Sequence, residues 1–237
     1  MNTDSWQDLL AATRELAKTA AGRRGVISVS PDIAAWLAQP AEAAAELAAL
    51  EQTVAACTQC ALHKTRTQTV FSDGNPAARL VFVGEAPGAD EDQQGIPFVG
   101  KAGQLLTAII EKGMGLRRSD VYICNVLKCR PPDNRDPLPE EAELCEPYLM
   151  RQIELVKPRA ICVLGRHAVR SLLRTEEGIG KLRGRWHFYM GIPVRVTYHP
   201  SYLLRNPGDK RKVWMDVLEV MKVYKGEINP TPDNPNV

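Results

Sequence analysis

The stretch Arg79-Leu-Val-Phe-Val-Gly84 decides the fold of this chain of 237 residues. It is a short, uninterrupted apolar run that stops at a glycine, which is typical of a β-strand buried on both faces. Strands of this kind belong to parallel sheets that helices cover on both sides. The stretch therefore predicts an α/β protein in which residues 79–84 form an inner strand.

Similar apolar runs alternate with helix-like segments along the rest of the chain. Strands that alternate with helices predict a parallel sheet with helices on both faces, which is a three-layer α/β/α sandwich. In such sheets a ligand binds beyond the carboxyl ends of the strands. The further predicted strands are 121–125, 159–165 and 193–198, and the predicted helices are 102–112, 139–156, 166–173 and 210–224.

The two ends of the chain differ from its middle part. Residues 1–50 are rich in alanine and predict an N-terminal helical extension, whereas residues 51–225 form the main domain. Residues 226–237 are rich in proline and asparagine, which is typical of a disordered tail. The helices predicted toward the N-terminus cover 4–21, begin again at Pro31, and then cover 40–56.

The composition is ordinary for a soluble globular protein, with 44% hydrophobic and 24% charged residues. A formal net charge of +2 means that nucleic-acid binding would depend on local basic patches. The first residues lack a secretory signal, and no apolar run approaches the roughly 20 residues that span a bilayer. We expect a cytoplasmic monomer that contacts no membrane.

Four of the six cysteines are the strongest candidates for metal ligands. In a reducing cytoplasm cysteines seldom form disulfides, so metal binding or core packing explains them better. Four soft sulfur ligands suit either an iron–sulfur cluster or a structural zinc ion. Cys124 and Cys162 instead fall within predicted strands, and we expect them to be buried in the core. The four candidate ligands are Cys57, Cys60, Cys129 and Cys145.

Polar side chains stand at the ends of the predicted strands. Glu85 opens an acidic loop after the first strand, and this acidity argues against a phosphate-binding loop. Phe98, further along that loop, is either a core ring or a face on which a planar ligand stacks. Asn125 ends the second strand, and its amide offers the donor and the acceptor that reading a nucleobase edge requires.

A proline-fixed loop follows the fourth predicted strand and begins at His199. Its leucines, Leu203 and Leu204, could present an apolar wedge to a base stack, which is a known way to open DNA. Basic residues close by could bind phosphates, although ordinary solvated faces carry the same charges. These basic residues are Lys181, Arg183, Arg185, Arg205, Lys210, Arg211 and Lys212.

Four motifs of the chain resemble those of the family-4 uracil-DNA glycosylases. They are Gly84-Glu-Ala-Pro-Gly88, residues 95–103, residues 125–132 and residues 199–205. The placement of the four candidate cysteines resembles that family too, in which they hold a 4Fe–4S cluster. The resemblance runs from about residue 55 to residue 224 and implies a central four-stranded parallel sheet between helices.

The resemblance implies an enzyme of base excision repair that hydrolyses the N-glycosidic bond of uracil in single- and double-stranded DNA. Free uracil and an abasic site would be the products. Phe98, Asn125 and His199 match family residues that stack on the flipped uracil, read its polar edge and hydrogen-bond its O2. Glu91 resembles the family position that crowds C5 of the base and so disfavours thymine.

The same resemblance implies which residues position the attacking water and which hold the DNA strand open. Glu85 would position the water together with backbone groups of its loop, which includes Ala86 and Gly88. A separate loop would hold the DNA strand open, and it contains Tyr202, Leu203 and Leu204.

Two other functions stay open. A non-catalytic module that binds DNA or protein could use the metal only to brace its fold. Some related proteins trap uracil-DNA covalently through a histidine in an Arg- and Lys-rich insertion before the fourth cysteine. Residues 126–144, which occupy that interval here, contain no histidine. Turnover is therefore favoured over trapping.

Overall fold

A computed structural model describes residues 31–232, with side chains from residue 41 onward. The chain divides into two compact units, Met1–Gln39 and Pro40–Val237. Helix α2 (Pro31–Ala55) is continuous across Pro40, where we predicted two separate helices because an interior proline usually breaks a helix. The helix predicted over 4–21 lies outside the described residues.

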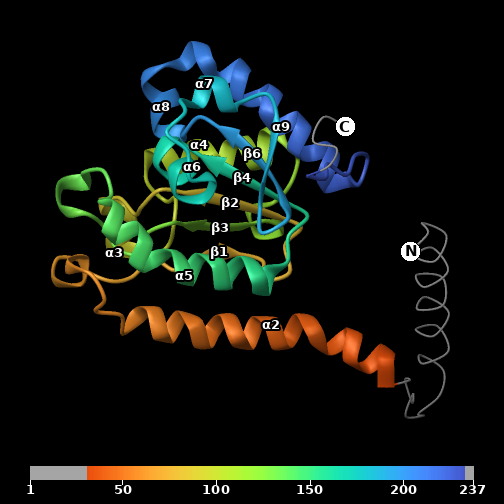
Figure 1. Cartoon of the computed structure of the whole chain (residues 1–237), viewed down its shortest axis with the longest axis horizontal. Helices are drawn as coiled ribbons and strands as arrows, with labels where there is room; N and C mark the ends of the chain where they lie inside the picture. The colour runs from red at the N-terminus through yellow and green to blue at the C-terminus, as the bar shows by residue number, and fades with distance from the viewer. Residues whose placement is uncertain (1–30, 233–237) are drawn as a thin grey trace. The chain divides into compact units, whose positions relative to one another are not determined.

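The centre of the larger unit is a six-stranded sheet in the order β1-β3-β2-β4-β6-β5 (Figure 1). Its four inner strands are parallel, which confirms the predicted four-stranded parallel sheet. In their register Gly84 lies opposite Asn125, so the first two predicted strands end side by side. The inner strands are β3 (Tyr122–Asn125), β2 (Leu80–Gly84), β4 (Ala160–Leu164) and β6 (Ile192–Thr197).

Two short antiparallel strands, neither of them predicted from the sequence, form the edges of the sheet. Strand β1 (Asp73–Gly74) pairs with β3, and β5 (Trp186–Tyr189) pairs with β6. Between β5 and β6 lie Met190 and Gly191 with φ values of 52° and 76°. Positive φ at both residues is the geometry of a tight hairpin turn. Strand β1 has only two residues, and the hairpin that contains β5 has no distinctive apolar pattern. Neither edge strand could therefore be predicted from the sequence.

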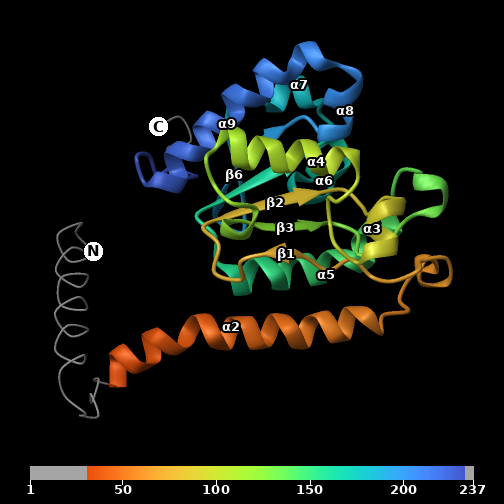
Figure 2. The ribbon, with the colours of Figure 1, turned by 180° about the vertical axis from the view of Figure 1, so that it is seen from behind.

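Helices cover both faces of the sheet, which confirms the three-layer α/β/α sandwich (Figures 1 and 2). Because side chains alternate along a strand, Val81 and Val83 enter one core and Leu80 and Phe82 the other. The first core is completed by α5 and α6, and the second by α4 and α9. These helices are α4 (Lys101–Ala108), α5 (Pro139–Val156), α6 (Arg166–Leu173) and α9 (Lys210–Lys225).

The remaining helices are short and lie mostly beside the carboxyl ends of the strands. Helix α4 passes at its end into a π-type turn over Ile109–Gly113, where a single regular helix was predicted to continue to residue 112. Among the described residues, no helix is both long and apolar enough to cross a membrane. The short helices are α3 (Ala89–Gln94), α7 (Ile179–Leu182) and α8 (Pro200–Arg205), with 3₁₀ turns at Ala61–Lys64, Arg118–Asp120, Pro132–Asn134 and Pro207–Asp209.

The borders of the larger unit differ from the predicted domain limits. Leu47 and Val54 of α2 are buried in the first core, so this unit begins before the boundary predicted at residue 51. At the other end Ile228 packs against the second core, beyond the predicted start of the tail. Residues 233–237 lie outside the described residues.

Candidate active site and metal centre

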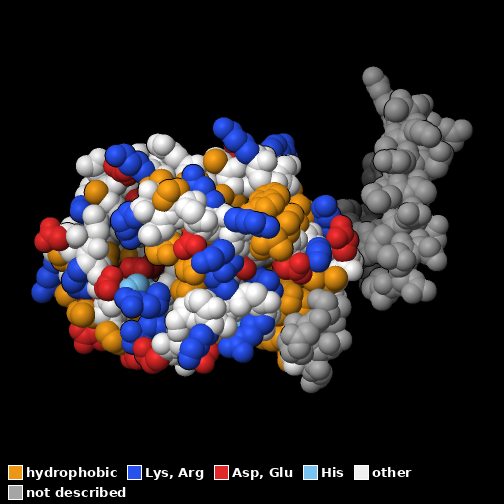
Figure 3. Space-filling model, turned by 90° about the horizontal axis from the view of Figure 1, so that it is seen from above, with side chains coloured by type: hydrophobic (Ala, Val, Ile, Leu, Met, Phe, Trp, Pro, Cys, Tyr) orange, Lys and Arg blue, Asp and Glu red, His pale blue; other side chains and the backbone are white. Residues whose placement is uncertain are grey.

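The carboxyl ends of the parallel strands open into one cleft of about 800 Å³. Most of the predicted site residues line it, which follows from their positions after the parallel strands. Figure 3 shows a hollow on this molecule in which a histidine and acidic side chains are visible, with basic side chains beside it. The predicted residues that line the cleft are Glu85, Ala86, Gly88, Glu91, Phe98, Asn125, His199, Tyr202 and Arg205.

Asn125 presents an unused hydrogen-bond acceptor in this cleft. Its Oδ1 atom is buried and has no hydrogen-bond partner among the described residues. The space around it is tight, because a Cβ atom on Gly84 would lie 2.4 Å from this Oδ1 and 2.4 Å from the Phe98 ring. Buried polar atoms are nearly always paired, so this oxygen is suited to a donor that arrives with a ligand.

Phe98 is held in a strained backbone conformation. Its φ of 56° lies in the left-handed region, which costs a residue other than glycine about 1–3 kcal/mol. The guanidinium of Arg118 holds this bend by donating to the carbonyls of Phe98 (3.2 Å) and Pro97 (2.6 Å). The Phe98 ring centroid lies 5.6 Å from that of His199. The two rings therefore form one wall of the cleft.

His199 is neutral, and one of its two tautomers is favoured. The backbone N–H of Ser201 donates to its Nδ1 (3.2 Å), so the ring proton belongs on Nε2. Burial lowers the pKa of His199 to about 4, and Arg205 adds to this shift while Glu91 opposes it. The residue therefore offers a neutral N–H donor at physiological pH.

Glu85 is a half-buried carboxyl group directly after the end of β2. Burial raises the pKa of Glu85 to about 7, and Asp136 raises it further, whereas Arg166 acts in the opposite direction. A carboxyl group with a pKa near neutrality is suited to accept or donate a proton in the working pH range.

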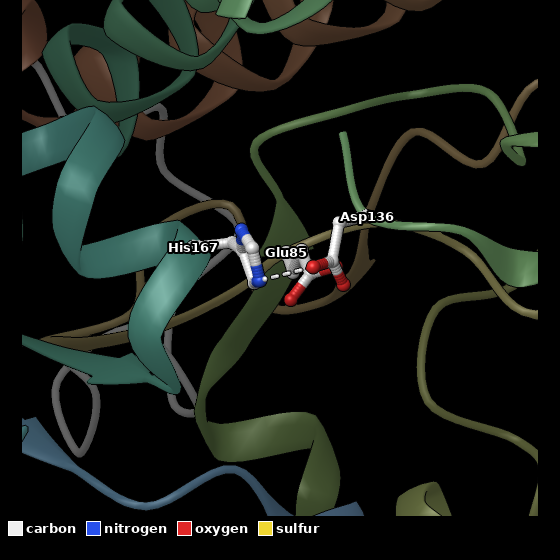
Figure 4. A group of neighbouring side chains, drawn as sticks. All are labelled: Glu85, Asp136 and His167. Atoms are coloured by element: carbon white, nitrogen blue, oxygen red, sulfur yellow. Dashed lines mark ion pairs between the residues drawn. The ribbon is translucent and has the colours of Figure 1, made fainter. Parts of the chain in front are cut away.

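Asp136 and His167 lie beside Glu85, although neither was predicted to belong to the site (Figure 4). His167 Nε2 lies 3.2 Å from an oxygen of Asp136, and one ligand atom of each of the three residues falls within 4.8 Å of the others. Two carboxyl groups and an imidazole are possible metal ligands. However, the Arg166 guanidinium lies 3.5 Å from His167 Nε2 and already supplies a positive charge.

A sequence signal for His167 existed. It lies on the first turn of α6, three residues after β4 ends at Leu164, and so at the carboxyl end of a parallel strand. Asp136 belongs to the loop before α5 and gives no comparable signal, because only the folded chain brings that loop to Glu85.

Glu91 joins two loops of the cleft. Its carboxylate accepts hydrogen bonds from the backbone N–H groups of Gly88 (3.0 Å), Val99 (2.9 Å) and Gly100 (2.9 Å). These bonds fix the loop after β2 to the segment that follows Phe98. The role of Glu91 in excluding thymine stays a prediction.

The four predicted cysteine ligands converge on one pocket, although the chain separates them widely. Arg66 Nη1 donates to Sγ of Cys129 (3.1 Å), and the backbone N–H of Lys128 donates to Sγ of Cys145 (3.4 Å). Four sulfurs with cationic and N–H donors around them fit a group of negatively charged thiolates. The pocket contains Cys57, Cys60, Cys129 and Cys145. By contrast, Cys124 and Cys162 are fully buried in strands, as predicted.

The structure contradicts two of the predicted DNA contacts. Leu203 is 1% exposed and packs in the second core, so it cannot act as a wedge, whereas Leu204 is 49% exposed. Arg183 is not free to bind a phosphate, because its Nε donates to Asp216 (2.7 Å) and its guanidinium lies over the Tyr198 ring. A charge in the sequence does not reveal its partner. Lys181 and Arg205 remain exposed.

Comparison with known proteins defines the class of this fold and site. Residues 71–218 match the family model of the uracil DNA glycosylase superfamily, and the chain belongs to this superfamily. Several type-4 uracil-DNA glycosylases are similar to it, which confirms the resemblance stated for its motifs.

Three of these relatives are alike in the extent of the match. The type-4 enzyme of Thermotoga maritima is 45% identical over 74% of this chain and 92% of its own length. The type-4 enzyme of Archaeoglobus fulgidus is 48% identical over 75% of this chain and 92% of its own length. That of Saccharolobus solfataricus is 44% identical over 72% and 83%.

Proposed function

We propose that this protein is a uracil-DNA glycosylase of base excision repair, acting as a cytoplasmic monomer. It hydrolyses the N-glycosidic bond of uracil in single- and double-stranded DNA and leaves an abasic site. The single observation that carries the proposal is the buried Oδ1 of Asn125, which has no partner among the described residues and lies next to the ring of Phe98. The type-4 uracil-DNA glycosylases among its relatives support it.

The base is recognised in an extruded position, because the cleft admits a ring only when it leaves the helix stack. Uracil carries an N3–H donor between two carbonyl acceptors. Asn125 Oδ1 accepts from N3–H, and the Asn125 amide NH₂ donates to O4. Stacking on Phe98 contributes about 1–3 kcal/mol toward the energy of flipping. Cytosine has an acceptor at N3, which would leave Oδ1 without a partner.

Bond cleavage leaves negative charge on the departing uracil, chiefly at its carbonyl oxygens. The Nε2–H of His199 donates to O2 as this charge develops. One preorganised donor of this kind typically contributes about 3–4 kcal/mol to lowering the barrier. A neutral donor suits this step, since the His199 proton stays on the ring while uracil leaves as an anion.

Glu85 in its carboxylate form orients the water that attacks the sugar carbon. Backbone groups of its loop, at Ala86 and Gly88, complete the water site. A pKa of about 7 for Glu85 leaves a substantial fraction ionised in the cell. As the water adds to the sugar, the carboxylate can take up the proton that the water releases.

We propose that the four clustered cysteines hold a 4Fe–4S cluster, as the resemblance of their placement implies. When bound, this group supplies iron–sulfur bonds that tie distant segments together. The segment after α2, with Cys57 and Cys60, is thereby fixed to the segment after β3 and to α5, with Cys129 and Cys145. A zinc ion in the purified protein would refute this assignment.

The entrance to the cleft is suited to DNA. Tyr202 stacks on Tyr198 with ring centroids 4.7 Å apart, and its hydroxyl donates to Asp209 (2.7 Å). This arrangement fixes helix α8, which bears the exposed Leu204. We assign the strand-opening wedge to Leu204, and the phosphate contacts to exposed basic residues including Arg205 and Lys181.

An assay of uracil release tests the proposal. Protein with its visible cluster absorbance intact should free uracil from single- and double-stranded DNA that contains uracil, but not from matched DNA that contains cytosine. Absence of release would refute the proposal. A gel shift without alkali-labile sites would then indicate a binding module, and a denaturant-stable adduct would indicate a covalent trap.

A further inference from the structure

Lys128 is a lysine buried in the core between the two sites described above. It is 1% exposed, follows Asn125 by three residues and directly precedes Cys129. Lysine is almost never fully buried unless it is paired, because its charge is strongly hydrated. A residue at this position therefore requires an explanation beyond packing.

One side of Lys128 is directed toward the base-reading residue. Its Nζ donates to the backbone carbonyl of Asn125 at 2.7 Å and to Oε1 of Gln152 on α5. The Gln152 amide donates in turn to the Tyr122 hydroxyl (2.9 Å) and to the Phe71 carbonyl (3.1 Å). This chain of hydrogen bonds fixes the peptide group that follows the Cα atom of Asn125, and thereby the backbone that carries its side chain.

The other side of Lys128 belongs to the cysteine pocket. Lys128 lines that pocket together with the four cysteines, and its backbone N–H donates to Sγ of Cys145. Thiolates that bind a metal are negatively charged, so a buried ammonium beside them reduces the electrostatic cost of placing them in the core. Arg66, which contacts Cys129, is the corresponding cation on the outer side.

On the basis of the proposed function, we propose that Lys128 is a positioning residue shared by the two sites. Its ammonium group holds the Asn125 carbonyl and balances the charge of the cysteine-bound cluster. Removal of this group should disturb base recognition and cluster electrostatics together, although Lys128 touches neither uracil nor iron.

Lys128→Met tests the proposal, because methionine keeps an unbranched apolar chain and loses the N–H donors. In the cluster-loaded variant we expect kcat/KM for uracil-DNA to fall about 10- to 100-fold, as is usual for residues that orient functional groups. Inhibition by free uracil should weaken, and the cluster reduction potential should become more negative because a nearby positive charge is lost. The last measurement does not depend on catalysis.

Tyr122→Phe is the matched control. It removes a hydroxyl from the same network, but leaves both contacts of the Lys128 ammonium in place. We expect lower thermal stability with unchanged uracil inhibition and reduction potential. If Lys128→Met does not fold, Gln152→Glu serves instead, since a carboxylate would draw the ammonium from the Asn125 carbonyl and change the same readouts in the same direction.

Two results would overturn the inference. If folded Lys128→Met has the same uracil inhibition and the same reduction potential as the wild type, Lys128 has no positioning role. Equal changes in the Tyr122→Phe control would reduce that role to packing. A wild-type protein that releases no uracil would instead refute the proposed function, while the reduction potentials would still test the link between Lys128 and the cluster.

Discussion

The backbone N–H of Ser201 donates a 3.2 Å hydrogen bond to Nδ1 of His199 and thereby directs the ring proton to Nε2. Two neighbouring residues on one turn of chain thus fix which nitrogen can act as a donor. Burial reinforces the arrangement by keeping the imidazole neutral. A strand end, a proline and a serine together prepare the donor before any substrate binds.

Replacement of His199 by alanine should lower kcat by about 10²- to 10³-fold, because one preorganised donor to the leaving base is lost. Single-turnover kinetics would measure the effect, with cluster absorbance as a check on folding. His187→Ala is the control, since the His187 ring bonds to the Leu182 carbonyl and does not line the cleft. A His199 variant with nearly wild-type turnover would contradict the assignment.

The pH dependence of kcat/KM should report the ionisation of Glu85. Its pKa of about 7 predicts a rate that rises with pH up to neutrality, since the carboxylate is the active form. Asp136→Asn removes a charge that raises this pKa, so the acid limb should move to lower pH. Arg166→Gln should move it to higher pH. Profiles that shift in the same direction, or not at all, would disprove this account.

Gly84→Ala should abolish uracil release. A Cβ atom at Gly84 would lie 2.4 Å from both the Asn125 amide oxygen and the Phe98 ring, so one of them must leave its position. Gly180→Ala is the control, because a Cβ atom there meets no heavy atom of the described chain within 4 Å. Activity and thermal melting of both variants would decide the matter, and an active Gly84 variant would argue against the tight pocket.

Cys129→Ser should eliminate most of the visible cluster absorbance and lower thermal stability, since it removes a ligand that pins the segment after β3. Cys162→Ala is the comparison, because Cys162 is equally a cysteine but lies inside β4, away from the pocket. That variant should keep its iron content. Equal iron in both proteins, determined by metal analysis, would contradict the four-cysteine site.

Leu204→Ala and Leu203→Ala should have opposite consequences. Leu204 is exposed, so its loss should reduce kcat/KM on double-stranded DNA more than on single-stranded DNA without changing stability. Leu203 is buried, and its truncation should cost about 2–5 kcal/mol of unfolding free energy. Denaturant unfolding and a comparison of the two substrates would separate these effects. The reverse pattern would restore Leu203 as the wedge.

The sequence predicts the parallel sheet well because buried strands and amphipathic helices leave strong local patterns. Helices α5 and α6 begin and end at the predicted residues. Asn125 and His199 could be found because each follows a strand, and parallel strands deliver their carboxyl ends to one edge. The hydrophobic pattern and the parallel topology are therefore enough to predict the residues at the centre of the site.

What the sequence does not reveal depends on partners far along the chain. Leu203 and Leu204 are chemically identical, and only the packing of α8 against the second core distinguishes buried from exposed. Arg183 is a residue type that commonly binds phosphate, yet its guanidinium forms an ion pair with Asp216. Asp136 lies near Glu85, but it belongs to a loop whose sequence has no hydrophobic periodicity that would predict its position. Such pairings arise only in the folded molecule.

The three backbone hydrogen bonds to Glu91 also limit how the substrate range can evolve. A shorter side chain would make more room in the cleft, but it would lose these hydrogen bonds and release both loops from each other at the same time. Replacing Glu91 to admit more kinds of base would therefore also disorder the pocket. Mutations that admit larger bases should arise at other cleft residues first, with Glu91 left unchanged.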